Sequence, residues 1–385
     1  MARHFDVVIT GGGPVGLAAV CALEHSGRRT LLIEPPLSAA TDPRAIAISY
    51  GSRLLLERLG AWSALHSISP ITHVHVSQRG GFGRALLSAE ENQLPALGYV
   101  ARYDELHRSL ANAASKLTSG WLQREQGWRL TRVESQRDHV SIGCDGGDIT
   151  AGLLIVADGG ATRQRLSGAT VDEIDFDQAA LVASVRARHL PPGLAFERFA
   201  PEGPIALLPF EDRMALVWST APSRAQALLA LPEPEFLAQL HDHFGDRLGR
   251  FTQVRGRAVF PLTRRAVSLQ STRVVLIGNA AQTLHPVAGQ GFNLGLRDAW
   301  ELAQIIARYP VSTGSVAEII RLFERQRARD RGASVKFTDS LIHLFSNDRD
   351  GLRLARGAGL GLLDLLPPLR RAFARRLAFG IRSGQ

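Results

Sequence analysis

Three glycines near the N-terminus have the spacing that is suited to binding a phosphate group. Gly11 permits a tight turn, Gly13 lets the backbone approach a pyrophosphate, and Gly16 lets the next helix pack closely against the preceding strand. Pro14 belongs to the same cluster, at the start of the predicted helix, whose N-terminal N–H groups attract an anion. The spacing therefore predicts a dinucleotide site with these four residues as contacts.

The segments around the glycines follow in the order that such a site requires. Residues 5–10 form a β-branched strand pattern, residues 17–26 form an apolar helix pattern that stops at Gly27, and residues 30–33 form a second strand that ends in Glu34. An acid at that position accepts hydrogen bonds from ribose hydroxyls. A glycine-rich turn without a ligand is the alternative, and the pattern alone does not separate NAD from FAD.

Two later segments also combine a buried strand with a polar turn. Residues 153–157 form the first strand pattern and lead into Asp158 and Gly159. Residues 273–277 form the second strand pattern and lead into a turn and then a long helix. The candidate contacts after this second strand are, in chain order, Asn279, Pro286, Gly289, Gln290, Gly291 and Asn293.

The three motifs, in this order and at these distances, resemble the flavoprotein monooxygenases related to p-hydroxybenzoate hydroxylase. The resemblance implies non-covalent FAD, with its ADP half at the glycine motif and Glu34. It implies that Asp158 and Gly159 serve FAD and a transiently bound NAD(P)H, which is a co-substrate beside O2. It also implies that the helix after the third motif points its N-terminus at the flavin ring, where it stabilises the negative charge of the reduced form.

A narrower resemblance is carried by residues 278–298, which are similar to the ubiquinone-biosynthesis hydroxylases. Other segments that resemble the same enzymes are residues 44–49, 71–80, 195–199, 216–218 and 339–347. The resemblance implies hydroxylation of the ring of 2-polyprenyl-6-methoxyphenol to the 1,4-benzoquinol, with other ubiquinone-biosynthesis proteins as partners. Asn279 stands where the wider family has an aspartate, but its amide oxygen also accepts hydrogen bonds.

Several functions stay open at this point. A sister ring-hydroxylation step, or hydroxylation of a small soluble aromatic compound, would keep the fold and the cofactor. A non-catalytic FAD-binding scaffold of a biosynthetic complex would keep the motifs without turnover.

Two arginines and one histidine are further candidates for the site. The resemblance places Arg44 against the FAD phosphates and Arg102 at a second cofactor contact, and a solvated loop arginine is the alternative reading of Arg44. His285 lies beside Pro286 near the predicted flavin. No side chain is assigned as a certain catalytic residue, because the flavin performs the difficult chemistry. The spacing of the histidines predicts no metal site.

We expect an α/β fold in which a Rossmann-like FAD-binding domain is interleaved with a substrate domain on a mixed β-sheet, followed by C-terminal helices. The expected FAD-binding domain is discontinuous, at residues 1–75, 95–175 and 265–345. Residues 76–94 and 176–264 are assigned to the substrate domain, and residues 346–385 to a basic helical tail. The predicted strands of the substrate sheet are residues 181–188, 205–209, 214–220 and 257–261.

Composition excludes several other classes of protein. The net charge is +9, but Lys116 and Lys336 are the only lysines, which indicates codon bias, and the body of the chain carries no nucleic-acid motif. Cys21 and Cys144 support neither a disulfide framework nor a metal site, and they fit a reducing cytoplasm. The N-terminal segment is typical of a first strand and not of a signal peptide, and no apolar run is long enough to span a bilayer.

The excess positive charge is concentrated at the C-terminal end. From residue 351 onward seven arginines stand against one acid, Asp364, which gives +6 of the chain's +9. Leu369, Phe373, Leu377 and Ile381 recur every four residues and form an apolar stripe. A basic amphipathic helix of this kind is expected to contact the inner face of a membrane, or a partner that holds the lipid substrate. The alternative is that the stripe packs on the protein's own surface.

Overall fold

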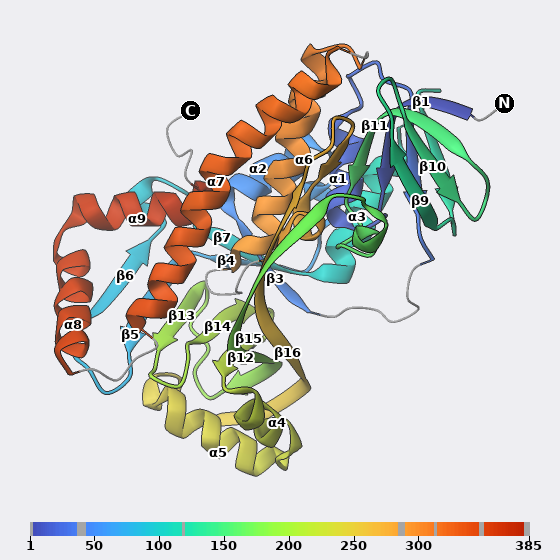
Figure 1. The fold of residues 1–385 in the computed structure, drawn as a ribbon. Helices are drawn as coiled ribbons and strands as arrows, with labels where there is room; N and C mark the ends of the chain where they lie inside the picture. The colour runs from blue at the N-terminus through green and yellow to red at the C-terminus, as the bar shows by residue number, and fades with distance from the viewer. Residues whose placement is uncertain are drawn as a thin grey trace.

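The computed structural model describes residues 3–36, 44–117, 120–283, 289–311, 314–345 and 350–380 (Figure 1). His285, Pro286 and Ile381, which the sequence analysis singled out, lie outside the described residues. The fold is α/β, as the sequence predicts. A largely parallel sheet and a larger mixed sheet are its two main layers, and C-terminal helices cover part of the mixed sheet.

The first sheet is built around the N-terminal strand. Its order is β8-β2-β1-β11-β10-β9, and β17 also pairs with β11. β1 pairs in parallel with β2 and β11, so that Ile9 stands opposite Leu32 and Ile155. Both faces of these central strands are buried, which explains their nearly continuous apolar sequences. The bounds are β1 (Arg3–Thr10), β2 (Thr30–Glu34), β8 (Leu122–Gln126), β9 (Leu130–Ser135), β10 (Val140–Cys144), β11 (Ile149–Val156) and β17 (Val274–Leu276).

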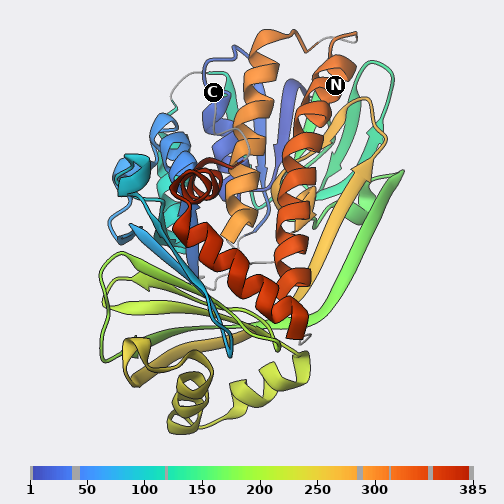
Figure 2. The same ribbon diagram turned by 90° about the vertical axis from the view of Figure 1, so that its left-hand side faces the viewer.

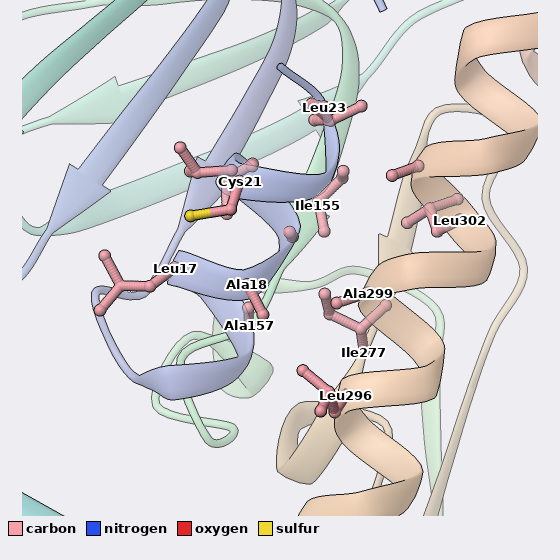
Figure 3. Packing of buried hydrophobic residues seen from close by; sticks show 14 of the residues in the cluster. Leu17, Ala18, Cys21, Leu23, Ile155, Ala157, Ile277, Leu296, Ala299 and Leu302 are labelled. Carbon is pink, nitrogen blue, oxygen red and sulfur yellow. The ribbon is translucent and has the colours of Figure 1, made fainter. Parts of the chain in front are cut away.

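Helices α1 (Pro14–Ala22), α3 (Tyr103–Ser115) and α6 (Gln290–Arg308) pack on this sheet through one buried cluster. Figure 3 shows part of it, with Leu17 and Ala18 of α1, Ile155 of β11, and Leu296 and Ala299 of α6. The approach of α6 to α1 depends on a glycine, because a Cβ at Gly295 would come within 2.8 Å of the side chain of Val15.

A buried ionic cluster ties α6 to the long helix α7 (Val316–Phe345). Arg327 of α7 is fully buried and pairs with Asp298 of α6 and, at 3.2 Å, with Asp330. Arg297 of α6 pairs with Asp330 at 3.0 Å. Among the described contacts, the cluster therefore contains two arginines and two aspartates, whose charges balance.

The second sheet has the order β18-β16-β12-β15-β14-β13-β5-β6. Helices α4 (Pro222–Ala230) and α5 (Glu233–Phe244) cover one face, where Leu216 and Trp218 pack against Phe236 and Leu240. The strands are β5 (His73–Gln78), β6 (Arg84–Ser88), β12 (Ala169–Ala187), β13 (Leu194–Phe199), β14 (Ile205–Phe210), β15 (Arg213–Thr220), β16 (Phe251–Leu269) and β18 (Gln282–Thr283).

The antiparallel pair β12 and β16 runs from one layer to the other (Figure 1). The expected domain limits near residues 176 and 264 fall inside these two strands. The pairing register shifts between Asp175 and Gln178, and Asp177 has a φ of 51°. The strands therefore stay continuous through an irregularity where the sequence analysis placed a boundary.

A small sheet and its helix connect the two layers. It has the order β3-β7-β4, with β3 (Ala45–Ser49), β4 (Ile68–Ile71) and β7 (Gly98–Arg102), and α2 (Tyr50–Arg58) follows β3. Short 3-10 helices lie at Trp62–Ala64, Glu90–Asn92, Arg163–Arg165, Asp246–Leu248 and Gly278–Ala280.

Helices α8 (Asp350–Leu365) and α9 (Pro367–Phe379) pack over β5 and β6, as Figure 2 shows. Asp364 accepts a hydrogen bond from the backbone N–H of Leu86 at 3.0 Å, and Arg370 makes a bidentate pair with Glu91 at 2.8 and 2.6 Å. These contacts hold the C-terminal helices against the body of the molecule. Within the described part of the chain, no helix combines the length and the apolar character needed to cross a membrane.

Candidate functional site

A cavity of about 1210 Å³ lies where the first sheet, the second sheet and the C-terminal helices meet. Its wall includes the glycine loop after β1, strand β3, the turn after β11 and the N-terminus of α6. Strands of the second sheet and helices α8 and α9 complete it. Of the residues predicted as contacts, those in the wall are Gly11, Gly13, Pro14, Arg44, Asp158, Gly159, Asn279, Gly289, Gln290, Gly291 and Asn293.

In the glycine loop, a side chain would find open space at Gly13 but none at Gly11 or Gly16. A Cβ at Gly11, where φ is 115°, would lie 2.6 Å from the carbonyl of Ala157, and a Cβ at Gly16 would lie 1.9 Å from the oxygen of Gly11. A Cβ at Gly13 would meet no atom within 4 Å. Gly13 precedes α1, whose first N–H groups therefore face the cavity without a side-chain cap. The loop fits the pyrophosphate of a dinucleotide, with Gly13 at the open side.

Glu34 lies beside this loop but is already held by a partner. Arg124 of β8 donates to its two carboxylate oxygens at 2.9 and 2.8 Å. A Cβ at Gly12 would come within 3.0 Å of the Glu34 side chain, so the acid borders the loop closely. A carboxylate has about four acceptor sites, and those that Arg124 does not use can accept from ribose hydroxyls. Sequence reasoning missed Arg124, since nothing local marks it.

Asp158 organises the turn after β11. Its carboxylate accepts hydrogen bonds from the N–H of Gly160 at 2.9 Å, from the N–H of Thr162 at 2.8 Å and from the Thr162 hydroxyl. The aspartate thus closes its own loop and holds the backbone of Gly159 in the cavity wall.

The N-terminus of α6 is the second helix end in the wall. Gly289 precedes it with a φ of 59°, a conformation that glycine adopts without strain, and the first turn carries no acid. The positive end of the helix dipole therefore faces the cavity and fits an anionic flavin ring. Asn293 ties this turn to β3, because its amide accepts from Ser49 at 2.8 Å and donates to Ala47 at 3.0 Å and to Gly289 at 2.7 Å.

The two predicted arginines lie in different surroundings. Arg44 is exposed in the cavity wall, with its guanidinium 5.7 Å from the ring of Tyr103 and 5.3 Å from that of Phe260. Arg102 makes a bidentate pair with Asp104 at 2.9 and 2.8 Å and does not contribute to the wall. This pair raises the pKa of the Arg102 guanidinium.

The remaining wall is mainly apolar and was not predicted from the sequence. The mixed sheet contributes Val74, Val76, Ala206, Leu208 and Val217, and the C-terminal helices contribute Leu360, Leu363, Leu369, Phe373 and Leu377. The predicted tail stripe therefore faces the chain's own cavity wherever the structure describes it, which was the alternative reading. The period of four in the tail was the signal, but the sequence did not show which surface the stripe covers.

Glu197 of β13 is an acid in this apolar part of the wall. Burial raises its pKa to about 8. The segment that contains it, residues 195–199, was singled out only for its resemblance, and no role was predicted for the acid.

Comparison with known proteins identifies relatives along the whole chain. The family model described as "FAD binding domain" matches residues 4–334. A ubiquinone hydroxylase, UbiL, of Rhodospirillum rubrum is 34% identical over 98% of this chain and 90% of its own length. The 3-demethoxyubiquinol 3-hydroxylase of Escherichia coli is 30% identical over 98% of both chains.

The fold is also similar to that of a solved structure. The p-nitrophenol 4-monooxygenase PnpA of Pseudomonas putida superimposes with a TM-score of 0.80 over 99% of this chain and 100% of its own chain, at 17% identity. At that identity the similarity is one of fold.

Proposed function

The chain belongs to the FAD binding domain family and is an FAD-dependent aromatic monooxygenase, and on that premise we propose that it hydroxylates the ring of 2-polyprenyl-6-methoxyphenol in ubiquinone biosynthesis. Two of the relatives that match along nearly the full length carry names of ubiquinone hydroxylases. The observation that supports this substrate best is a single cavity with a polar, glycine-lined part and a broad apolar part.

FAD is the cofactor, and when bound it supplies the redox chemistry that uses NAD(P)H and O2. We assign its pyrophosphate to Gly13 and the N-terminus of α1, and its flavin ring to the N-terminus of α6. We assign the ribose hydroxyls to the carboxylate of Glu34, which borders the glycine loop. We assign Arg44, whose side chain lies in the cavity wall, to the phosphates of FAD.

The apolar part of the cavity holds the phenol ring and the first part of its polyprenyl chain. Its side chains exclude water from the reacting ring, which protects reactive oxygen chemistry from hydrolysis. A cavity of about 1210 Å³ is larger than the usual small-molecule pocket of roughly 300–1,000 Å³, and it has to accept a ring beside the cofactor.

The mouth of the cavity supports peripheral contact with a membrane, and we place the protein at the inner face of the bilayer. Leu369 lines the cavity and is 46% exposed, so it lies at the mouth. Other exposed leucines nearby are Leu354, Leu362 and Leu365 of α8, and Leu366 between the two helices. Exposed leucines near a cluster of arginines suit the headgroup region of anionic lipid, from which a polyprenylated phenol would enter.

Cells that lack this protein test the proposed step. They are expected to accumulate 2-polyprenyl-6-methoxyphenol, measured by lipid extraction and mass spectrometry. The second candidate is the step named for the E. coli relative, 3-hydroxylation of 3-demethoxyubiquinol. Accumulation of 3-demethoxyubiquinol would assign the protein to that step and exclude the first.

A further inference from the structure

Glu197 stands alone as an acid on an apolar stretch of the cavity wall. Strand alternation puts its side chain on the same face of β13 as Ala195 and Phe199, which also line the cavity. In the neighbouring strands, Val76 of β5 and Ala206 of β14 stand directly opposite Glu197. The carboxyl group therefore faces the cavity from a part of the wall whose neighbouring side chains are apolar.

Within the described part of the chain, no hydrogen bond or ion pair of the Glu197 carboxyl group is found. Its pKa rises to about 8 because burial disfavours the charged form, and no neighbouring charge contributes to the shift. The ionisable groups that share the cavity wall are Arg44, Tyr103, Asp158, Arg265 and Arg356. Those near the opposite face of the sheet are His75, Arg198, His243 and Arg247.

Stability does not account for an acid at this place. Glu197 is half-buried, and ionising its carboxyl group in apolar surroundings costs free energy that no partner among the described residues offsets. A role in the chemistry of the molecule that the cavity binds explains an acid at this position better than a structural role does.

We propose that Glu197 accepts the proton of the substrate's phenol hydroxyl. This inference rests on the proposed function, because a phenol must occupy the cavity. The phenol O–H bond breaks, the proton joins a carboxylate oxygen of Glu197, and the electron pair stays on the phenolate oxygen. The negative charge then spreads to the ring carbons ortho and para to that oxygen, which makes them more reactive toward an electrophilic oxygen. The carboxyl group afterwards releases its proton to water.

The strength of the base suits this transfer. A phenol has a pKa of about 10, whereas an ordinary glutamate, at about 4.3, is nearly six units weaker as a base. At a pKa of about 8, Glu197 comes within about two units of the phenol. General bases work best when their pKa lies near the working pH and close to that of the group they deprotonate.

The test compares FAD-loaded wild type with Glu197→Gln, Glu197→Asp and the control Glu202→Gln. The probe is 2-methoxyphenol with one isoprenyl unit at position 6, and the rate of product formation is measured from about pH 6 to pH 10. Glu202 is an exposed acid in the loop after β13 and pairs with Arg79. The wild-type rate is expected to rise through about pH 8, as Glu197 ionises. In Glu197→Gln that rise disappears and the rate falls by about 10²–10⁴-fold, while Glu202→Gln behaves as wild type.

A second readout does not depend on turnover. In the apo protein, the melting temperature of wild type is expected to fall between about pH 6.5 and pH 8, and that of Glu197→Gln to stay constant over the same range. An unchanged rate and pH profile in Glu197→Gln overturns the inference while the proposed function stands. Absence of any hydroxylation by FAD-loaded wild type overturns the proposed substrate, and the inference with it.

Glu197→Asp decides the matter if the glutamine variant does not bind FAD. A slower reaction that keeps a pH-dependent rise, because a carboxylate is still present but reaches less far, supports the inference. A wild-type rate and profile in the aspartate variant overturns it.

Discussion

At the scale of single residues, the glycines of the motif have two different physical reasons, which the sequence motif does not distinguish. Gly11 and Gly16 are required by the chain's own packing, since a Cβ at either position would overlap backbone atoms. Gly13 is different, because open space lies beside it and its backbone, with φ at −73° and ψ at 172°, is one that other residues adopt. The packing of the described residues does not require a glycine at position 13, and we propose that the ligand does.

Gly13→Val tests this difference. We expect the free energy of unfolding of the apo variant to lie within about 1 kcal/mol of that of the apo wild type, because the new side chain meets no protein atom. Its affinity for FAD should fall at least tenfold, or about 1.4 kcal/mol, since the side chain occupies the space of the pyrophosphate. Flavin absorbance after gel filtration and apo-protein melting measure the two effects. A folded variant with full FAD content would show that the assignment of the phosphate site is wrong.

Titratable groups on the mixed sheet and on helix α5 predict a maximum of stability near pH 6.5. The pKa of Glu197 is raised to about 8, so its folded form binds a proton more tightly than its unfolded form. The stability that this provides is lost progressively as the pH rises above the ordinary glutamate pKa, and the loss is complete at about pH 8. The pKa values of His75 and His243 are lowered to about 4 by burial and nearby arginines, so their contribution is lost as the pH falls below about 6.5 toward 4.

Urea unfolding of the apo protein between about pH 4 and pH 9 measures this profile. On the alkaline side the free energy of unfolding should fall by at most about 1.4 kcal/mol per pH unit, the limit for one proton. Glu197→Gln should remove the fall between about pH 6.5 and pH 8, and it should steepen the rise below about pH 6.5, where the glutamate opposes the two histidines. An alkaline slope that persists in the variant would assign it to another group.

At the scale of elements, the cluster between α6 and α7 connects helix packing to the cofactor site. Asp298 pairs with the buried Arg327 and also accepts a hydrogen bond from the N–H of Gly278 at 3.0 Å. The next residue, Asn279, lies in the cavity wall. Helix α7 therefore supports the turn after β17, although none of its described residues lines the cavity.

Breaking this cluster on one side leaves an uncompensated buried charge. Arg327→Met should destabilise the protein by about 3–5 kcal/mol, because Asp298 and Asp330 then lack their shared arginine. Restoring neutrality with Asp298→Asn in the same chain should recover part of that loss. Thermal or urea unfolding of the single and double variants checks the coupling, and an additive double variant would argue against an ionic link.

At the scale of the whole molecule, the cavity exists only because parts far apart in the sequence come together. The glycine loop, the floor of the mixed sheet and helices α8 and α9 all contribute to its wall. α8 and α9 are at once a wall of the cavity, through Leu363 and Phe373, and a surface that exposes leucines. Removing them would open the cavity, so a deletion cannot isolate their effect on membrane contact.

Point substitutions of the exposed leucines separate the two roles. Replacing Leu354, Leu362, Leu365 and Leu366 with glutamine should leave FAD content intact, since none of them lines the cavity. Flotation with liposomes that contain anionic lipid should fall at least tenfold, because full burial of even one leucine is worth roughly 1.5–3 kcal/mol. Turnover of a short-chain phenol should persist. Unchanged flotation would show that this surface does not bind the membrane.

The local parts of the site were predictable from the sequence. The strand, glycine loop, helix and second strand of residues 3–34 appear in the expected order. They are predictable because their contacts join residues close in the chain, and because turn and helix-start chemistry is local. For the same reason the amphipathic stripe of the tail was recognised, although its partner surface was not.

The sequence by itself determined the α/β class and the glycine loop, because each depends on short patterns with a fixed physical meaning. The choice of FAD over NAD rested on the resemblance of the three motifs to the flavoprotein monooxygenases. Only the tertiary structure decided that Arg124 holds Glu34, that Asp104 holds Arg102, and that the tail stripe faces the cavity. It alone placed Glu197 on an apolar floor, where β5 and β14 flank β13. A pKa depends on what surrounds a group in space, and the register of strands from distant parts of the chain sets those surroundings.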